Sequence, residues 1–512
     1  MMGRMARSFL MGEIVAVLDK KGQGATEKAV KMLEVLAPKN PNAYGIATPS
    51  TVRIEMSINA LQRVHTEKTR VALGCVFSKI LPNDKPQLTK LNEAIMVFEG
   101  RIYPSTTCMS NMEVAASKLY PCSEKTVEAF IREVEGDFTF AIAKPQMIIA
   151  GRDSVGVQPL YYGENAIFAA LASARKALWK IGIEKVCSFP PGHLAHINEE
   201  GFRFKPVKVL SYSKPAQMAT AFAVKKLEDL LKSSVKTRVC GLKEVAVAFS
   251  GGIDSSLIAF LAKKSGVDVH LIHVSLKNQP ETKHAQMVAE KLKLPLHVCL
   301  FNESDVEKTL PKVVWLVEEA DVTKLSIGIP IYWVAEKAAE MGLKVLLAGQ
   351  GADELFGGYK RYVNYYLCED GDGVYRKMFT DILRLHEDNI ERDVKICKFH
   401  GVELRLPFAT YEMAMFAACL PIEFKIERRQ DALRKIILRR VAENFGCPKC
   451  IFEYPKRAMQ YATGVDKAIK KLSKKKGMCV KEYLNNVFQK VIKRPKDAYI
   501  QFVWRSIGNG PQ

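Results

Sequence analysis

The stretch that decides the fold runs from Val245 to Ser256 and reads VAVAFSGGIDSS. Its first five residues are apolar without interruption, which is typical of a strand buried on both faces of a parallel sheet. A polar, glycine-containing loop follows, and then an apolar segment with the character of a helix. The order of strand, glycine loop and helix predicts a cradle for phosphate.

Each residue type in this loop suits an anion. Gly251 and Gly252 let the backbone approach phosphate oxygens, the N-terminus of the following helix presents N–H groups, and three serines add hydroxyl donors. No Gly-Lys-Ser/Thr follows, so the loop is not of the Walker type. The alternative is an ordinary glycine turn capped by serine, and the buried strand before it together with Asp254 argues against that alternative.

Beyond the loop, apolar runs of strand and helix length alternate, which predicts a doubly wound parallel sheet of the Rossmann type. We expect strands over 245–249, 269–274, 296–301 and 345–348, and helices from 255, over 283–292 and over 329–339. Before the loop, the polar segment 211–217 precedes an amphipathic helix that begins near Thr220. We therefore expect a domain boundary between 210 and 220.

The first 210 residues have a different pattern, in which strand-like runs outnumber helices. The expected strands cover 13–18, 71–77, 94–98, 138–143, 147–150 and 166–170. Such a pattern predicts an antiparallel, layered α+β domain. A chain of 512 residues also exceeds what one core usually organises. We expect domains over 11–210 and 220–465, and a basic C-terminal extension over 466–512.

The formal charge of +21 raises the question of a nucleic-acid partner. The densest basic stretch, from Asp466 to Asp497, carries apolar residues at helical spacing, so we favour a solvated amphipathic helix and leave nucleic-acid binding open. No apolar run approaches the length of a membrane span. The scattered cysteines in apolar contexts are typical of reduced thiols, and we expect a cytoplasmic protein without a membrane partner.

A second motif, Leu347 to Tyr359, reads LAGQGADELFGGY and combines small residues with two carboxylates, which predicts a backbone-lined pocket. The loop 250–256 resembles the signature of ATP-pyrophosphatases. The second motif resembles the corresponding string of the asparagine synthetase family. The resemblance continues in Glu318–Lys324 (EEADVTK), in Val402–Phe408 (VELRLPF) and in Tyr454–Ala458 (YPKRA).

This resemblance implies ATP and Mg²⁺ as cofactors and assigns roles by position. The residues expected to hold ATP and its pyrophosphate are Ser250, Gly251, Gly252, Asp254, Ser255, Ser256, Val274, Ala348 and Gly349. The residues expected to act in catalysis are Lys456, Asp353 and Glu354. Those expected to contact the acceptor substrate are Glu318, Asp321, Gln350 and Arg405. Mg²⁺ would be held by Asp254 and Asp353.

The sequence departs from that family at the acceptor site. Gln350 stands where the family has a glutamate, Ala348 replaces a serine, and Thr410 stands where an aspartate usually follows. The loss of a charge changes how a substrate or a metal is held. The departures therefore concern the acceptor substrate and leave the residues expected for carboxylate adenylation in place, and Glu354 or Glu318 could compensate.

The first domain resembles class II glutamine amidotransferase domains in 134–138, 151–162 and 189–193, which implies a four-layer αββα sandwich of the Ntn-hydrolase type. Working members begin with a catalytic cysteine, and here the corresponding stretch is Met11-Gly12-Glu13. The chain also has Glu99-Gly100-Arg101 in place of Asn-Gly-Glu, and Asn111 in place of an aspartate. We predict an inactive glutaminase domain that serves packing, regulation or partner contact.

These features lead to three hypotheses. The first is an amide-forming ligase that takes aspartate and ammonia, with nitrogen from solution or from a separate glutaminase. The second is amidation or ring closure of another carboxylate, including one linked to RNA. The third is a nucleotide-binding pseudoenzyme that regulates a partner. The sequence also leaves a homodimer open.

Overall fold

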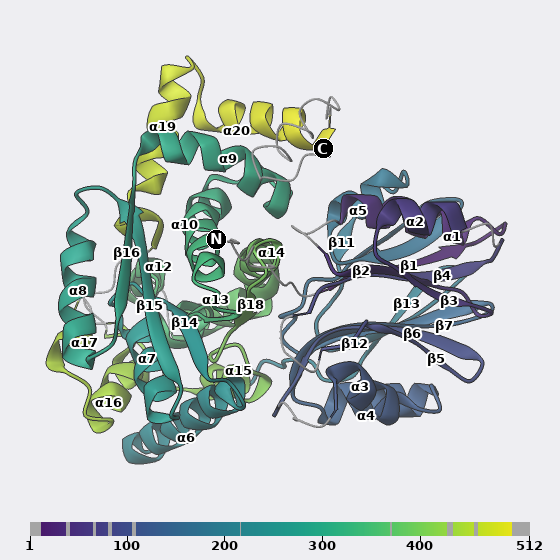
Figure 1. Ribbon diagram of the computed structural model, residues 1–512. Coiled ribbons are helices and arrows are strands. Elements are labelled where there is room, and N and C mark those ends of the chain that lie inside the picture. Colours follow the sequence, from purple (N-terminus) through teal and green to yellow (C-terminus); the bar gives the residue numbers. More distant parts are fainter. Residues whose placement is uncertain are drawn as a thin grey trace, which may run out of the picture. The chain divides into compact units, whose positions relative to one another are not determined.

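The computed structural model describes residues 12–36, 41–64, 68–79, 84–104, 109–215, 217–368, 371–427, 434–454 and 459–493. These residues form two compact units (Figure 1). The first contains the described residues up to Val209 and the segment Lys398–Glu403, and the second contains the rest. Lys456 lies outside the described residues.

The described part of the first unit is built on two antiparallel sheets. The first sheet has the order β11 (Cys187–Ser188), β9 (Tyr161–Glu164), β10 (Phe168–Ala172), β1 (Glu13–Asp19), β4 (Val71–Phe77), β2 (Ala43–Ala47) and β3 (Val52–Glu55). The second has the order β13 (Gly201–Pro206), β12 (His193–Asn198), β8 (Met147–Arg152), β7 (Gly136–Lys144), β6 (Ala94–Ile102) and β5 (Leu88–Leu91).

Strand β1 shows why the unit has four layers. Side chains alternate between the two faces of a strand. Ile14 and Leu18 accordingly join the core between the two sheets, while Val15 and Val17 pack with the helices α1 (Ala25–Val35) and α5 (Arg175–Lys180). The second sheet is covered on its outer face by α3 (Asn111–Leu119) and α4 (Glu124–Glu133). The predicted αββα sandwich is confirmed.

The second unit contains a sheet in the order β16 (Leu296–Phe301), β15 (Asp268–Leu276), β14 (Glu244–Ala248), β17 (Val345–Leu347) and β18 (Glu403–Arg405). Strands β14, β15, β16 and β17 pair in parallel. Val245 and Val247 pack with α6 (Thr220–Val239), α7 (Ile253–Lys264) and α8 (Pro280–Leu292). Helix α10 (Val322–Glu340) packs against β14 and β15 and stacks Trp333 on Phe301. The predicted doubly wound parallel sheet is confirmed.

Strand β14 is the point at which the order of the sheet reverses. The chain proceeds from β14 to β15 on one side, and later returns to β17 on the other. In open α/β sheets, ligands bind at the carboxyl ends of the strands at this position. Both predicted motifs begin there, because the first follows β14 and the second follows β17.

The remaining helices complete the two units. They are α2 (Ile58–Val64), α9 (Glu303–Val317), α11 (Ala352–Phe356), α12 (Lys360–Cys368), α13 (Gly371–Leu383), the π-helix η1 (His386–Ile390), α14 (Glu391–Phe399), α15 (Tyr411–Cys419), the 3-10 helix η2 (Ile422–Phe424), α16 (Ile436–Asn444), α17 (Lys449–Phe452), α18 (Met459–Ala462), α19 (Val465–Lys475), α20 (Val480–Phe488) and the π-helix η3 (Gln489–Lys493). Among the described residues, no helix has the length and apolar character needed to cross a membrane.

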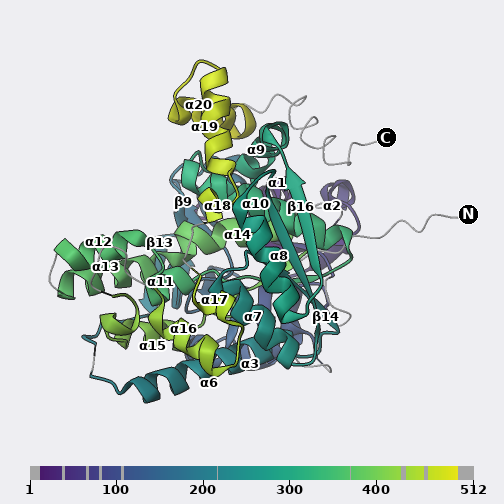
Figure 2. The same ribbon diagram turned by 90° about the vertical axis from the view of Figure 1, so that its left-hand side faces the viewer.

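The start of the basic C-terminal stretch forms α19, which packs on α9 and α10 (Figure 2). Ile469 and Leu472 are buried in that contact. Lys471 and Lys475 form ion pairs with Glu303 at 2.6 and 3.2 Å. Helix α19 of this stretch is thus amphipathic, and its lysines partly compensate acids of the same unit.

Candidate active site

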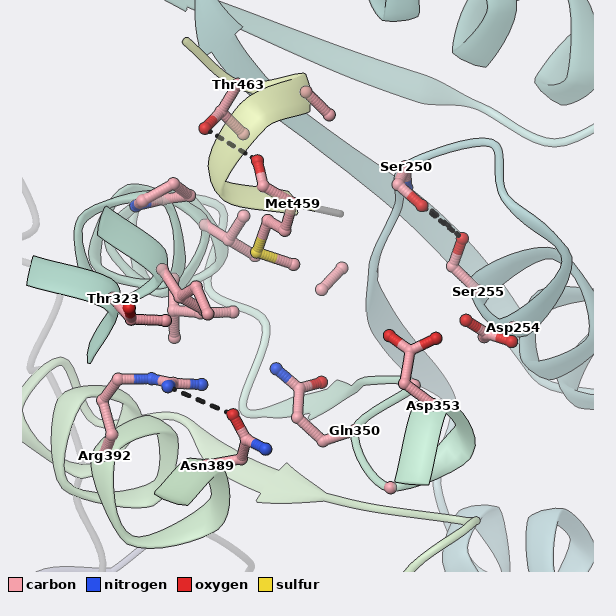
Figure 3. Close-up of a pocket in the computed structure, with 18 of the residues that line it drawn as sticks. Ser250, Asp254, Ser255, Thr323, Gln350, Asp353, Asn389, Arg392, Met459 and Thr463 are labelled. Carbon is pink, nitrogen blue, oxygen red and sulfur yellow. Dashed lines mark hydrogen bonds between the residues drawn. The ribbon is translucent and has the colours of Figure 1, made fainter. Parts of the chain in front are cut away.

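A cavity of about 470 Å³ opens at the carboxyl ends of β14, β15 and β17 (Figure 3). Its walls come from the loop 250–256, called the phosphate loop after its predicted role, from the Gly349–Glu354 segment, from α10 and from the segment around Thr463. Ile272 and Val274 of β15 contribute apolar surface opposite the residues of α10. The predicted adenosine contact Val274 therefore lines this cavity, and Asp321 lines it as well.

The phosphate loop has the backbone geometry that its glycines allow. Gly251 adopts a φ of +75°, and a Cβ there would lie 3.0 Å from the backbone of Ala285. Gly252 forms the N-cap of α7 in extended conformation, and its N–H donates to Ser250 Oγ at 3.2 Å. Ser250 and Ser255 lie side by side with their hydroxyl oxygens 3.3 Å apart. Two hydroxyls therefore lie at the N-terminus of a twelve-residue helix, an arrangement that could bind an anion.

The two motifs touch at Gly349. A Cβ at this position would lie 2.9 Å from the Cβ of Asp254, so a larger residue would separate the second motif from the first. Ala348, which precedes it, is buried beneath the cavity and its N–H donates to the carbonyl of Arg405. Gly351 adopts a φ of +93° and begins α11, which carries Asp353 and Glu354.

Asp254 and Asp353 come together around a lysine that the sequence motifs did not single out. Lys435 Nζ lies 2.6 Å from Asp254 Oδ2 and 2.6 Å from Asp353 Oδ1. The two carboxylates line the cavity and could hold Mg²⁺, which typically takes one or two protein carboxylates and completes its shell with phosphates and water. Within the described residues, no group of three or more metal-type side chains is present. The donor set thus fits a metal that arrives with a nucleotide.

Gln350 lines the cavity, and a hydrogen bond to Asp393 holds its side-chain amide in place. Its Nε2 donates to Asp393 Oδ2 at 2.5 Å, and Arg392 binds both oxygens of the same carboxylate at 2.7 and 3.1 Å. Burial raises the pKa of Asp393, and Arg392 opposes that shift. The amide nitrogen is thereby engaged with Asp393, which orients the oxygen Oε1 away from that carboxylate.

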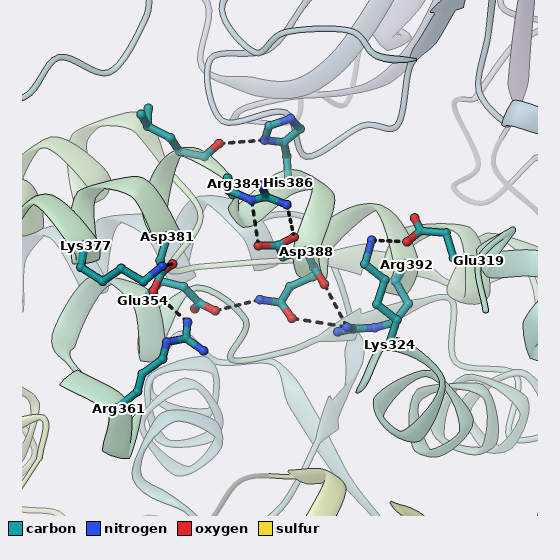
Figure 4. A network of polar contacts seen from close by, with 12 residues as sticks. Glu319, Lys324, Glu354, Arg361, Lys377, Asp381, Arg384, His386, Asp388 and Arg392 are labelled. Carbon is teal, nitrogen blue, oxygen red and sulfur yellow. Dashed lines mark hydrogen bonds and ion pairs between the residues drawn. The ribbon is translucent and has the colours of Figure 1, made fainter. Parts of the chain in front are cut away.

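Glu354 is a buried carboxylate at the edge of the cavity. It accepts hydrogen bonds from Tyr359 Oη and from Asn389 Nδ2, the latter at 2.7 Å. Burial, followed by the charge of Asp353, raises the pKa of Glu354 to about 7. Asn389 in turn accepts from Arg392 in a network that continues along η1 and α14 (Figure 4). A carboxyl group with this pKa can exchange a proton near neutral pH.

The remaining predicted residues lie in different environments. Asp321 caps α10 by accepting from the N–H of Lys324 at 2.8 Å. Glu318 is buried and pairs with Lys395 at 3.1 Å. Arg405 is also buried and donates a hydrogen bond to the carbonyl of Arg238. Neither residue lines the cavity. Gly251, Gly252 and Ser256 belong to the same loop but do not line the cavity. Thr410, at the family's aspartate position, caps α15 by accepting from Met413 N at 3.1 Å.

In the first unit, the site expected for a glutaminase is filled by protein atoms. A Cβ at Gly12 would lie 2.3 Å from Gln87 Oε1 and 2.8 Å from the carbonyl of Val76. Glu99 is fully buried, pairs with Lys398 and accepts from Ser173 Oγ at 2.6 Å.

The space beside this site is small as well. Arg101 pairs with Asp84 at 2.9 Å, and the cavity that both line measures only about 10 Å³. Asn111 Oδ1, where an aspartate was expected, accepts the N–H of Ile102 at 2.9 Å. A volume of this size holds about one water molecule and no amino acid.

Comparison with known proteins agrees with this organisation. The asparagine synthase family model matches residues 226–370 and 366–477, and the glutamine amidotransferase domain model matches 79–180. A protein of Methanocaldococcus jannaschii, provisionally named asparagine synthetase (glutamine-hydrolyzing) 1, is 33% identical over 71% of this chain and 76% of its own.

More distant relatives have similar names. An asparagine synthetase (glutamine-hydrolyzing) of Sandersonia aurantiaca is 29% identical over 75% of this chain and 76% of its own. Among solved structures, the glutamine phosphoribosylpyrophosphate amidotransferase of B. subtilis shares 14% identity and a TM-score of 0.34, covering 56% of this chain and 81% of that one.

Proposed function

Because this chain belongs to the asparagine synthetase family, we propose that it adenylates the side-chain carboxylate of aspartate and then transfers ammonia to that carbon. ATP would lose pyrophosphate in the first step, and AMP would leave in the second, giving asparagine. The observation that supports this proposal is the meeting of the two motifs at one cavity, where Ser250, Asp254 and Asp353 lie together.

The residues divide the work by their chemistry. The hydroxyls of Ser250 and Ser255 and the N-terminus of α7 would bind the departing pyrophosphate. Asp254 and Asp353 would hold Mg²⁺, which neutralises charge on adjacent phosphates when it is bound. Val274 and the backbone at Gly349 would hold the adenosine. Lys456 retains its proposed role at the adenylate, on the resemblance of its motif alone.

The nitrogen would come from ammonia and not from glutamine hydrolysed by this chain. Three observations support this part: the missing side chain and crowded surroundings of Gly12, the buried pair of Glu99 and Lys398, and the cavity of about 10 Å³ beside Arg101. A cysteine at position 12 would be crowded by the neighbouring backbone, and the cavity that the described residues leave beside Arg101 is too small for glutamine. The ammonia would be taken from solution or from a separate glutaminase.

Glu354 is the proposed base for ammonium. Ammonia is mostly protonated at neutral pH, and a proton acceptor with a pKa of about 7 can remove that proton without itself being fully protonated. Asn389 and Tyr359 hold the carboxylate in place at the cavity edge. This role would compensate for the absence of a carboxylate at Gln350.

The test is a reaction of the full-length chain with ATP, Mg²⁺, aspartate and ¹⁵N-ammonium. We expect equal amounts of pyrophosphate and ¹⁵N-asparagine, and no labelled asparagine when amide-labelled glutamine replaces ammonium. Asp254→Asn should lose both products. Pyrophosphate release that does not require aspartate would contradict the assignment of the acceptor.

A second acceptor class is favoured by one observation, the neutral Gln350 where a charged group would recognise an α-ammonium. A carboxylate other than aspartate, free or linked to RNA, would then be the substrate. Pyrophosphate release that depends on added tRNA or on another carboxylic acid would support it over aspartate.

A further inference from the structure

Lys435 occupies an unusual position between the two carboxylates proposed to hold the metal. Its side chain is fully buried, whereas those of Asp254 and Asp353 are 13% and 21% exposed. The ammonium thus contacts both carboxylates from the protein side, while the carboxylates face the cavity. Lys435 precedes α16, some eighty residues beyond the second motif.

The surroundings are adapted to this lysine. Lys435 itself adopts a φ of +60°, which is uncommon for a residue other than glycine. A Cβ at Gly358 would lie 1.8 Å from Asp353 Oδ1 and 2.5 Å from Lys435 Cε, so the bridge requires glycine there. Arg434 Nη1 donates to the carbonyl of Gly358 at 2.7 Å and holds the two segments together.

We propose that Lys435 competes with the divalent cation for Asp254 and Asp353, so that the metal binds tightly only together with the phosphates of the nucleotide. This inference rests on the proposed phosphate and metal site. One ammonium between two carboxylates cancels half of their negative charge and occupies an oxygen of each. A divalent cation without phosphate should therefore bind the two carboxylates less tightly.

A bound phosphate chain changes the balance. Its oxygens lie beside the Ser250 loop and offer the ammonium another anionic partner, which releases carboxylate oxygens for the cation. The cation then completes its shell with phosphate oxygens and water, as Mg²⁺ prefers. Lys435 therefore couples metal binding to nucleotide binding and suppresses occupation by free metal.

The test measures Mn²⁺ binding to the full-length chain by electron paramagnetic resonance, with and without pyrophosphate, after subtraction of Mn²⁺ bound by pyrophosphate in solution. Without pyrophosphate, Lys435→Met should bind Mn²⁺ at least about tenfold more tightly than the wild type, since an internal cation has been removed. Lys435→Arg should behave like the wild type. With pyrophosphate, the wild type should gain more affinity than Lys435→Met.

Unchanged Mn²⁺ affinity in Lys435→Met without pyrophosphate would overturn the proposal. Lys435→Gln, which is one atom shorter but keeps an uncharged hydrogen-bond donor, provides the same comparison if the methionine variant does not fold. Lys263→Met, on the outer end of α7, is the control for a lost lysine and should leave Mn²⁺ affinity unchanged. The arm without nucleotide needs no catalysis, so it decides the competition even if the proposed reaction fails.

Discussion

Replacing Gln350 with glutamate, the residue that the family carries, should destabilise this protein instead of restoring a lost function. In the native chain, Nε2 of Gln350 donates to Asp393 at 2.5 Å. A glutamate of the same length would present a carboxylate oxygen to a carboxylate oxygen. Both groups can only accept hydrogen bonds when ionised, so the contact becomes repulsive.

The size of the destabilisation caused by Gln350→Glu can be worked out from the distance between the two carboxylates. Two like charges about 4 Å apart at an effective dielectric constant of about 20 repel by about 4 kcal/mol. Arg392, which binds both oxygens of Asp393, offsets part of this repulsion. A residual of about 2 to 3 kcal/mol corresponds to a rise of roughly two units in the pKa of the introduced carboxyl, from about 4.3 to about 6.

The raised pKa of the introduced carboxyl determines how the stability of Gln350→Glu depends on pH. A carboxyl whose pKa is higher in the folded state than in the unfolded state makes the folded protein bind more protons, so stability falls as pH rises between the two values. The loss caused by Gln350→Glu should be complete near pH 8 and at least about 1 kcal/mol smaller at pH 5. Urea unfolding of variant and wild type at both pH values measures it.

Two controls separate repulsion from other effects. Adding Asp393→Asn to Gln350→Glu gives the glutamate a donor and should recover most of the loss, which a double-mutant cycle would show as coupling. Gln146→Glu, at an exposed position, should change stability by less than about 0.5 kcal/mol at either pH. A loss that is the same at pH 5 and pH 8, or that the second change does not relieve, would refute the reasoning.

Other perturbations test the rest of the molecule. Glu99→Gln should lower the free energy of unfolding in urea by about 3 kcal/mol, because it removes the ion-pair partner of the buried Lys398. Glu199→Gln, in an exposed ion pair, should lower it by less than about 1 kcal/mol. Equal losses in the two variants would contradict the importance of burial. Glu354→Gln should remove the rise of asparagine formation through about pH 7 when rates are compared at equal free ammonia, because the group with that pKa is lost; a retained rise would assign the proton acceptor elsewhere. Gly349→Ala should weaken ATP binding at least about tenfold by calorimetry, since its methyl group would push the two motifs apart, and unchanged affinity would count against the proposed contact.

The fold was largely predictable because its signals are local. Strands β4 and β16 match their predicted limits, and β1 matches its own to within a residue. Strands β1 and β4 are buried along almost their whole length, and strands buried on both faces read as continuous apolar runs. The change from strand β14 through a glycine-containing loop to helix α7 was predictable for a related reason, since an apolar run, two glycines and a second apolar segment follow one another in the sequence, whereas phosphate binding by the loop stays a prediction. The position of both motifs at the reversal of the sheet follows from the strand order.

The polar partners of the site could not be predicted in the same way. Asp393 and Asn389 come from helical segments and Lys435 from the residue before α16, all of ordinary polar composition, and only tertiary packing brings them to the residues that line the cavity. Glu318 shows the opposite case. Its motif pointed to the substrate, yet it ends α9 with a φ of +65° and pairs with Lys395 beneath the surface. A motif indicates which segments approach a site and not which side chains face it.

The filled amidotransferase site of the first unit has a consequence for the history of this lineage. A cysteine at position 12 would crowd Gln87 Oε1 and the Val76 carbonyl, and loss of the Glu99 carboxylate would remove the ion-pair partner of the buried Lys398. On our proposal that this unit no longer hydrolyses glutamine, a single substitution back toward that activity would pass through a less stable protein. The proposed loss would therefore be hard to reverse in evolution, because several compensating substitutions would have to appear together.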